Sequence, residues 1–177
     1  MNVKTILTLV LFFSFAACSS DKKDPTKDGE TPIIKVFNYQ NFELQAGDLL
    51  FQDGDCGDFC EAIEKVTIGI NGARLSHIGM VVPIGTNGLA VIEAVEKGVK
   101  ITPTGEFFNR SMDGADNSKV LVGRLKKEKQ SLIPQAIRFA QSKVGSDYDS
   151  RFNLLNDSYY CSELIYAAFI VNLCVFL

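Results

Sequence analysis

The chain has 177 residues, of which 46% are hydrophobic and 22% are charged, and its formal net charge at pH 7 is −3. This length suits one domain with its own core, and the composition is that of an ordinary globular protein. The small negative charge gives no electrostatic reason to bind nucleic acid, so nucleic-acid partners are set aside.

The N-terminal residues have the pattern of an export signal. Residues 1–4 are short and positively charged, residues 6–15 form an apolar run, and Ala16 and Ala17 supply small residues before a cleavage point. The run is shorter than the roughly 20 residues that span a bilayer. We therefore expect residues 1–17 to be a signal peptide.

Cys18 follows these alanines, and FAAC resembles a bacterial lipoprotein box, in which the cysteine is lipidated and becomes the mature N-terminus. Phe15 departs from the aliphatic residue usual in that box, and plain secretion with an incidental cysteine is the alternative. Residues 18–32 are polar without apolar periodicity, so they are expected to form a flexible tether before a domain at residues 33–177. The expected location is the bacterial cell envelope, with a lipid anchor in a membrane.

The first predicted elements of the domain are a strand, a helix and a hairpin. Residues 48–52 predict a short strand, and residues 58–66 predict a helix that is capped by Asp58 and packs on this strand. Residues 77–84 and 88–95 are β-rich runs joined by GTNG, which is typical of a hairpin. The apolar positions of the helix are Phe59, Ala62, Ile63 and Val66.

The later elements are two strands and two helices. Strands are predicted at residues 99–102 and 119–125, and an amphipathic helix at residues 130–144. In the last helix, apolar positions recur at helical spacing and residues 156–158 supply its cap, which places Cys161 in the first turn. The apolar faces of these helices comprise Ile133, Ile137, Ala140 and Val144, and Cys161, Leu164, Ile165 and Ala168.

Three side chains form a candidate catalytic group. A cysteine at a helix N-terminus has a lowered thiol pKa, above all beside a histidine, and His77 is the only histidine of the chain. Glu93 lies in the apolar run AVIEAV on the strand that pairs with that of His77, where a carboxylate is costly unless paired. The alternatives are a structural thiol, a structural core histidine, and a glutamate that faces solvent.

The segments LQAGDLLF, RLSHIGMVV, LAVIEAV and YYCSELIYAAF together resemble the YiiX/YebB-like group of the NlpC superfamily, which are papain-fold cysteine hydrolases of circularly permuted order. The resemblance runs from about Glu43 to Phe169. It implies an α+β, permuted papain-like fold with a small antiparallel sheet packed against the cysteine helix. It also implies that Cys161 is the nucleophile, His77 the general base and Glu93 the orienting residue, and that Asp48 closes a turn. No cofactor is expected.

The other cysteines allow several interpretations. Cys56 and Cys60 can form a disulfide in an oxidising compartment, although so short a loop is demanding. A zinc site that adds His77 and Cys161 is an alternative whose spacing fits no familiar zinc motif. Cys174 is most simply an apolar helix residue. Relatives continue beyond the cysteine helix whereas this sequence ends at VNLCVFL, so C-terminal truncation is also an open alternative.

The expected function is hydrolysis of an amide or related acyl bond by a thiol. Because superfamily relatives cut cell-wall peptides, a cell-wall peptide is the default substrate, with a lipid or a small amide as alternatives. A lipid-anchored binding module that keeps the cleft without turnover is the competing hypothesis, and a structural envelope protein is a third.

Overall fold

The computed structural model describes residues 43–170 except residues 68, 87 and 155. These residues belong to one compact unit of the chain, Ile34–Leu177. The predicted signal peptide and tether, Cys18 and Cys174 lie outside the described residues. In the described ranges, no helix has both the length and the apolar character needed to cross a bilayer.

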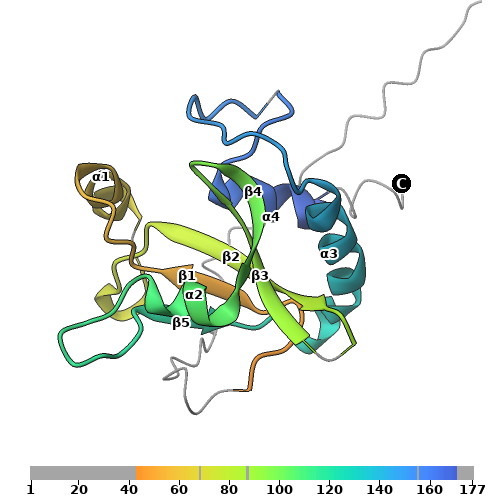
Figure 1. Ribbon diagram of the computed structural model, residues 1–177, viewed down its shortest axis with the longest axis horizontal. Coiled ribbons are helices and arrows are strands. Elements are labelled where there is room, and N and C mark those ends of the chain that lie inside the picture. Colours follow the sequence, from red (N-terminus) through yellow and green to blue (C-terminus); the bar gives the residue numbers. More distant parts are fainter. Residues whose placement is uncertain (1–42, 68, 87, 155, 171–177) are drawn as a thin grey trace, which may run out of the picture. The chain divides into compact units, whose positions relative to one another are not determined.

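A five-stranded antiparallel sheet forms the centre of the unit (Figure 1), with the strand order β4-β3-β2-β1-β5. All five predicted strands are confirmed, and the hairpin closes with Ile84 opposite Gly88. Its antiparallel meander follows from the short connections between consecutive strands β2, β3 and β4. The bounds are β1 Leu49–Gln52, β2 His77–Ile84, β3 Gly88–Val95, β4 Gly98–Pro103 and β5 Val120–Gly123.

Helices cover both faces of this sheet. Within the described residues the α-helices are α1 (Asp58–Val66), α2 (Thr104–Asn109), α3 (Ile133–Ser142) and α4 (Cys161–Ile170), and the 3-10 helices are η2 (Ile70–Gly72) and η3 (Lys127–Leu132). α3 and α4 pack on one face and α2 on the other. The α+β class, and the packing of the sheet against the cysteine helix, are therefore confirmed. α2 was not predicted, because six residues are too few to show a helical period.

Alternation along the two central strands creates two cores. Met80 and Ile92 point toward α3 and α4, whereas their neighbours Val81 and Val91 point toward α2. Gly79 lies on the α2 side, where an added Cβ would be 2.5 Å from a methyl carbon of Val91. The first core also contains Val82, Ala94, Val99, Ala136, Ile137, Ala140, Leu164, Ile165 and Ala168, and the second contains Leu50, Phe107, Phe108, Val120 and Val122.

The predicted packing of α1 is wrong, although its bounds are confirmed. Phe59 is 47% exposed and Val66 81% exposed, and the buried residue of this helix is Cys60. Asp58 is the first helical residue and not the cap, which is Gly57. Because the buried residue of α1 is a disulfide-bonded cysteine and not one of the predicted apolar positions, helical spacing alone could not identify its buried side.

The helix predicted at residues 130–144 is shorter in the structure. It begins at Ile133 because η3 precedes it, and Pro134 lies in its first turn, where the missing N–H of proline is tolerated. Its predicted face is buried at Ile137 and Ala140, whereas Val144 lies beyond the helix end and is 47% exposed.

Candidate active site

Cys161 is the first residue of α4 and the free cysteine of the described residues. The preceding residue, Tyr160, is hydrogen-bonded to the first turn of the helix. Its carbonyl accepts the N–H of Leu164 at 3.0 Å, and its N–H donates to the Glu163 carboxylate at 3.3 Å. The cap is therefore at Tyr160 and not at residues 156–158, contrary to the prediction. Since the first N–H groups of a helix have no acceptor within it, the Cys161 N–H can bind a developing negative charge.

His77 and Glu93 lie on the neighbouring strands β2 and β3. The His77 Nε2 is 2.6 Å from Glu93 Oε2, and the ring also forms a side-chain hydrogen bond with Cys161. Since Nε2 is engaged by Glu93, Nδ1 is the nitrogen left to exchange a proton with the thiol. The structure thus brings together the three side chains that the sequence singled out.

The Glu93 carboxylate is fully buried and forms hydrogen bonds with three side chains. In addition to His77, Thr102 donates to Oε1 at 2.5 Å, and Arg110 forms an ion pair at 2.6 Å. Sequence reasoning missed Thr102 and Arg110, because neither lies in a distinctive motif. The signal that could have revealed a cation was the apolar setting of Glu93, since a buried carboxylate needs a charged partner.

The ionisation of this group favours a thiolate beside an imidazolium. Burial lowers the pKa of His77, but its hydrogen bonds with Cys161 and Glu93 outweigh this and raise that pKa to about 9. Burial raises the pKa of Cys161, but the bond with His77 and backbone bonds from Ile78 and Ser162 lower it overall. Burial likewise raises the pKa of Glu93, yet its bonds with His77, Arg110 and Thr102 bring it to about 2. These contacts therefore favour ionisation of the Cys161 thiol relative to an ordinary cysteine.

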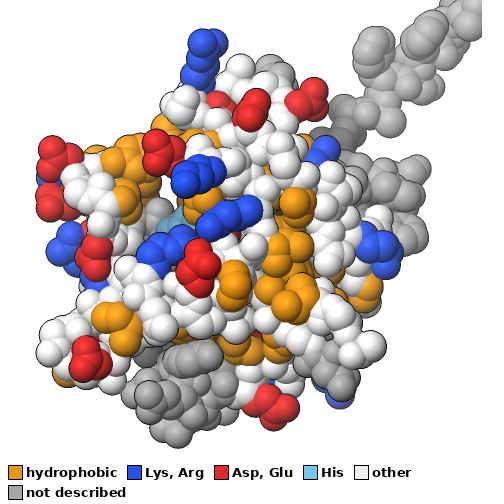
Figure 2. Space-filling view, viewed as in Figure 1, with side chains coloured by type: hydrophobic (Ala, Val, Ile, Leu, Met, Phe, Trp, Pro, Cys, Tyr) orange, Lys and Arg blue, Asp and Glu red, His pale blue; other side chains and the backbone are white. Residues whose placement is uncertain are grey.

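Two adjoining hollows give access to the pair. One has a volume of about 420 Å³ and is lined in part by Asp55, Glu96 and Arg110. The other has a volume of about 410 Å³, and among the described residues that line it only His77 carries an ionisable nitrogen or a carboxylate. Both hollows contact His77 and Cys161. In Figure 2 the one pale blue side chain, His77, is visible in a recess bordered by Lys and Arg side chains.

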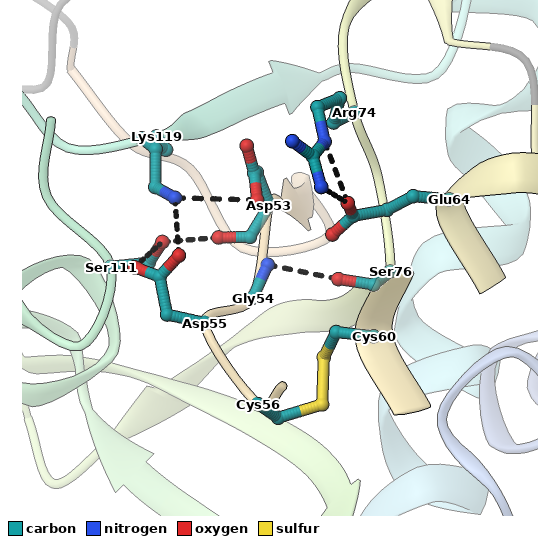
Figure 3. Close-up of a disulfide and its surroundings, with 10 residues drawn as sticks. All are labelled: Asp53, Gly54, Asp55, Cys56, Cys60, Glu64, Arg74, Ser76, Ser111 and Lys119. Carbon is teal, nitrogen blue, oxygen red and sulfur yellow. Dashed lines mark hydrogen bonds and ion pairs between the residues drawn. A yellow bond between two sulfur atoms is a disulfide. The ribbon is translucent and has the colours of Figure 1, made fainter. Parts of the chain in front are cut away.

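The wall of the first hollow is held by a disulfide. Cys56 and Cys60 are bonded to each other, which settles their pairing, so they provide no thiolates for the zinc arrangement (Figure 3). The loop before them, residues 53–55, is held by two kinds of contact. The Gly54 N–H donates to Ser76 Oγ at 2.9 Å, and Lys119 forms ion pairs with Asp55 and Asp53. Since Ser76 precedes His77 directly, the same contacts support the histidine.

Asp48 closes a turn, as the sequence implied. Its buried carboxylate accepts the N–H of Gln45 at 2.7 Å, and Arg124 binds both of its oxygens, at 2.7 and 2.8 Å. These bonds hold the entry into β1, which pairs with β2 and so with the strand of His77.

Comparison with known proteins identifies the family. The profile described as "Permuted papain-like amidase enzyme, YaeF/YiiX, C92 family" matches residues 43–177. A crystal structure titled as the metalloprotein yiiX from Escherichia coli O157:H7 is similar, with a TM-score of 0.55 and 28% identity, over 75% of this chain and 68% of that one. A search of curated proteins finds no match. With the profile spanning well over half of its length, this chain belongs to the YaeF/YiiX family of permuted papain-like amidases, which confirms the permuted papain-like fold.

Proposed function

We propose that this protein hydrolyses an amide or related acyl bond with Cys161 as nucleophile, His77 as general base and acid, and Glu93 as the orienting residue. The observation that carries the proposal is the continuous chain of hydrogen bonds from Cys161 through His77 to the buried Glu93 carboxylate. A nucleophile, a base within reach and a third group that orients the base are the components of nucleophilic acyl transfer.

The reaction would proceed in two steps. The Cys161 thiolate attacks the carbonyl carbon, the oxygen takes the negative charge, and the main-chain N–H of Cys161 donates to it. As the carbon–nitrogen bond breaks, the His77 imidazolium gives its proton to the leaving amine, and a thioester remains on Cys161. The neutral His77 then takes a proton from water, whose oxygen displaces the thiolate and releases the acid.

A cell-wall peptide is our proposed substrate, and placement in the NlpC superfamily is part of the same proposal. The similar Escherichia coli protein is titled a metalloprotein. In this chain, no cluster of three or more His, Cys, Asp or Glu side chains within the described ranges is arranged to hold a metal ion. We therefore derive no step through a metal.

The proposal is tested by incubating the full chain with cell-wall peptides and a panel of acyl p-nitroanilides. We expect release of the amine, together with a thioester adduct on Cys161 in the mass spectrum of protein quenched with acid. If a panel member binds but is never cleaved, and Cys161 carries no adduct, the protein is a binding module with an inactive cleft.

We further propose that Cys18 is lipidated and anchors the protein in a membrane of the cell envelope. The support is the sequence, in which the apolar run and Ala16-Ala17 end directly on Cys18. Expression in bacteria followed by fractionation should place the protein in the membrane fraction, with an acylated N-terminal cysteine in its mass spectrum. Recovery of a soluble protein cut at another position would contradict the anchor, and a Cys18→Ala variant is the control.

A further inference from the structure

Arg110 completes the coordination of the Glu93 carboxylate. It follows α2 directly, and its Nη1 donates to Oε2 at 3.0 Å while its Nη2 donates to Oε1 at 2.6 Å. Oε2 is also hydrogen-bonded to His77 Nε2, and Oε1 also accepts a hydrogen bond from the hydroxyl of Thr102. Each oxygen therefore has two partners, so that the carboxylate has a single favoured orientation.

Arg110 and His77 are supported by the same aromatic ring. The guanidinium carbon of Arg110 lies 5.2 Å from the centre of the Phe107 ring, and the His77 ring centre lies 5.9 Å from it. Phe107 is fully buried, and its carbonyl accepts a hydrogen bond from Gln52. The arginine is thus held in place before any substrate binds, and it costs no reorganisation during the reaction.

The charges of the site alternate in sign along the bonded chain. In the ionised form they run from the Cys161 thiolate to the His77 imidazolium, the Glu93 carboxylate and the Arg110 guanidinium. Lys100, on β4, pairs with Glu106 of α2 at 3.4 Å, so these two charges offset each other. Burial raises the pKa of Tyr148, which keeps this neighbouring phenol neutral near pH 7. The remaining charged groups that line the same hollow are Asp55, which pairs with Lys119, and Glu96.

We propose that Arg110 is a positioning residue that acts on His77 through Glu93, by holding the carboxylate and by sharing its negative charge. An unshared carboxylate at 2.6 Å would stabilise the imidazolium so strongly that it becomes a poor acid toward the leaving group. With Arg110 on the opposite side, Glu93 orients the ring while His77 can still release its proton. This inference rests on the proposed function.

A purely structural role for Arg110 makes a different prediction. If Arg110 only compensates a buried charge, its loss disturbs Glu93, and His77 responds as it does to the loss of Glu93. If Arg110 shares the charge, the two losses change the pKa of His77 in opposite directions, because one removes a cation near the imidazolium and the other removes an anion.

The experiment is an NMR titration of the full chain labelled with ¹⁵N and purified without a polyhistidine tag. Because the chain contains one histidine, the ring signals report His77 without assignment. For Arg110→Gln we expect the pKa of His77 to rise by on the order of one pH unit, and for Glu93→Gln we expect it to fall. Turnover of Arg110→Gln should be about tenfold slower at neutral pH, with KM within about twofold of wild type, since a weaker acid protonates the leaving group.

Two control variants keep the inference falsifiable. Arg110→Lys retains the charge but not the two-oxygen contact, so the pKa of His77 should rise clearly less than in Arg110→Gln. Arg124 likewise donates to both carboxylate oxygens of its partner, Asp48. Arg124→Gln therefore makes the same charge change in a similar pair and should leave the titration of His77 unchanged. A fall of the pKa in Arg110→Gln, or no change, overturns the charge-sharing role.

The outcome for the wild type separates this inference from the proposed function. If His77 of the wild type titrates near its ordinary value and Cys161 reacts like an ordinary thiol, the proposed function itself fails. If the wild type behaves as proposed and only the Arg110→Gln shift is missing, this inference alone fails.

Discussion

Cys161→Ala is expected to reduce turnover by at least about 10⁴-fold, and His77→Ala by a similar factor. A methyl group cannot attack a carbonyl carbon, and without the imidazole the thiol loses the hydrogen bond that lowers its pKa and the leaving amine loses its proton donor. The measurement is the initial rate on the panel substrate that the wild type cleaves fastest. The two losses should not add in the double variant, because the residues act as one unit.

The control for these variants lies on the same helix. Tyr166 is 58% exposed on α4, so Tyr166→Ala tests whether truncation on this helix is harmful by itself, and it should keep turnover within about threefold of wild type. Cys161→Ala should still bind the substrate, since the cleft is unchanged. Retention of a substantial rate in Cys161→Ala would show that another group performs the attack.

Glu93→Gln is expected to slow turnover by about 10- to 10³-fold while the protein still folds. The amide has one acceptor oxygen, whereas His77, Thr102 and Arg110 donate four hydrogen bonds to the two oxygens of Glu93. The amide NH₂ therefore faces a donor, and His77 loses the anion that stabilises its protonated form. In a serine triad the corresponding change costs about 10⁴, but a thiolate already paired with imidazolium depends less on its third residue.

The Glu93 variant should also lose about 1–3 kcal/mol of stability, because Arg110 is left without its anionic partner but is one-third exposed and so partly solvated. Thermal unfolding measures this loss. Glu106→Gln is the matched control: it makes the same substitution in the exposed pair with Lys100, and both rate and stability should remain near wild type. An unchanged rate in Glu93→Gln would exclude an orienting role for this carboxylate.

The parts of the fold that the sequence predicted are those with a strong local pattern. The runs HIGMVVPI and GLAVIEAV are β-rich and are joined by the turn sequence GTNG, so both strands of the hairpin were predicted with the observed bounds. In the last helix, Leu164, Ile165 and Ala168 recur at helical spacing and are buried. The pairing of β2 with β3 then places His77 and Glu93 on adjacent strands.

The parts that were missed depend on contacts between distant residues. Arg110 lies in the polar stretch NRSMDG, where an arginine normally faces solvent, and only the tertiary structure brings it 2.6 Å from Glu93. The orientation of α1 was wrong because its disulfide buries Cys60, and Phe59 instead stacks on Phe152 with ring centres 6.2 Å apart. No local spacing carries information about the Arg110–Glu93 or the Phe59–Phe152 contact, whereas the Cys56–Cys60 bond joins residues four apart and was left open by the sequence.

The central claim is that Cys161 is an activated thiolate, and its rate of alkylation at pH 6 tests this most directly. The full chain is treated with iodoacetamide, and the modification of Cys161 is followed by peptide mass spectrometry beside a small thiol of ordinary pKa. We expect Cys161 to react about tenfold faster or more, because its contacts with His77 lower its pKa and so raise its ionised fraction at pH 6 above that of the reference thiol, even after allowing for the lower nucleophilicity of a less basic thiolate. The advantage should disappear in His77→Ala. A wild-type Cys161 that reacts no faster than the reference thiol would contradict the account.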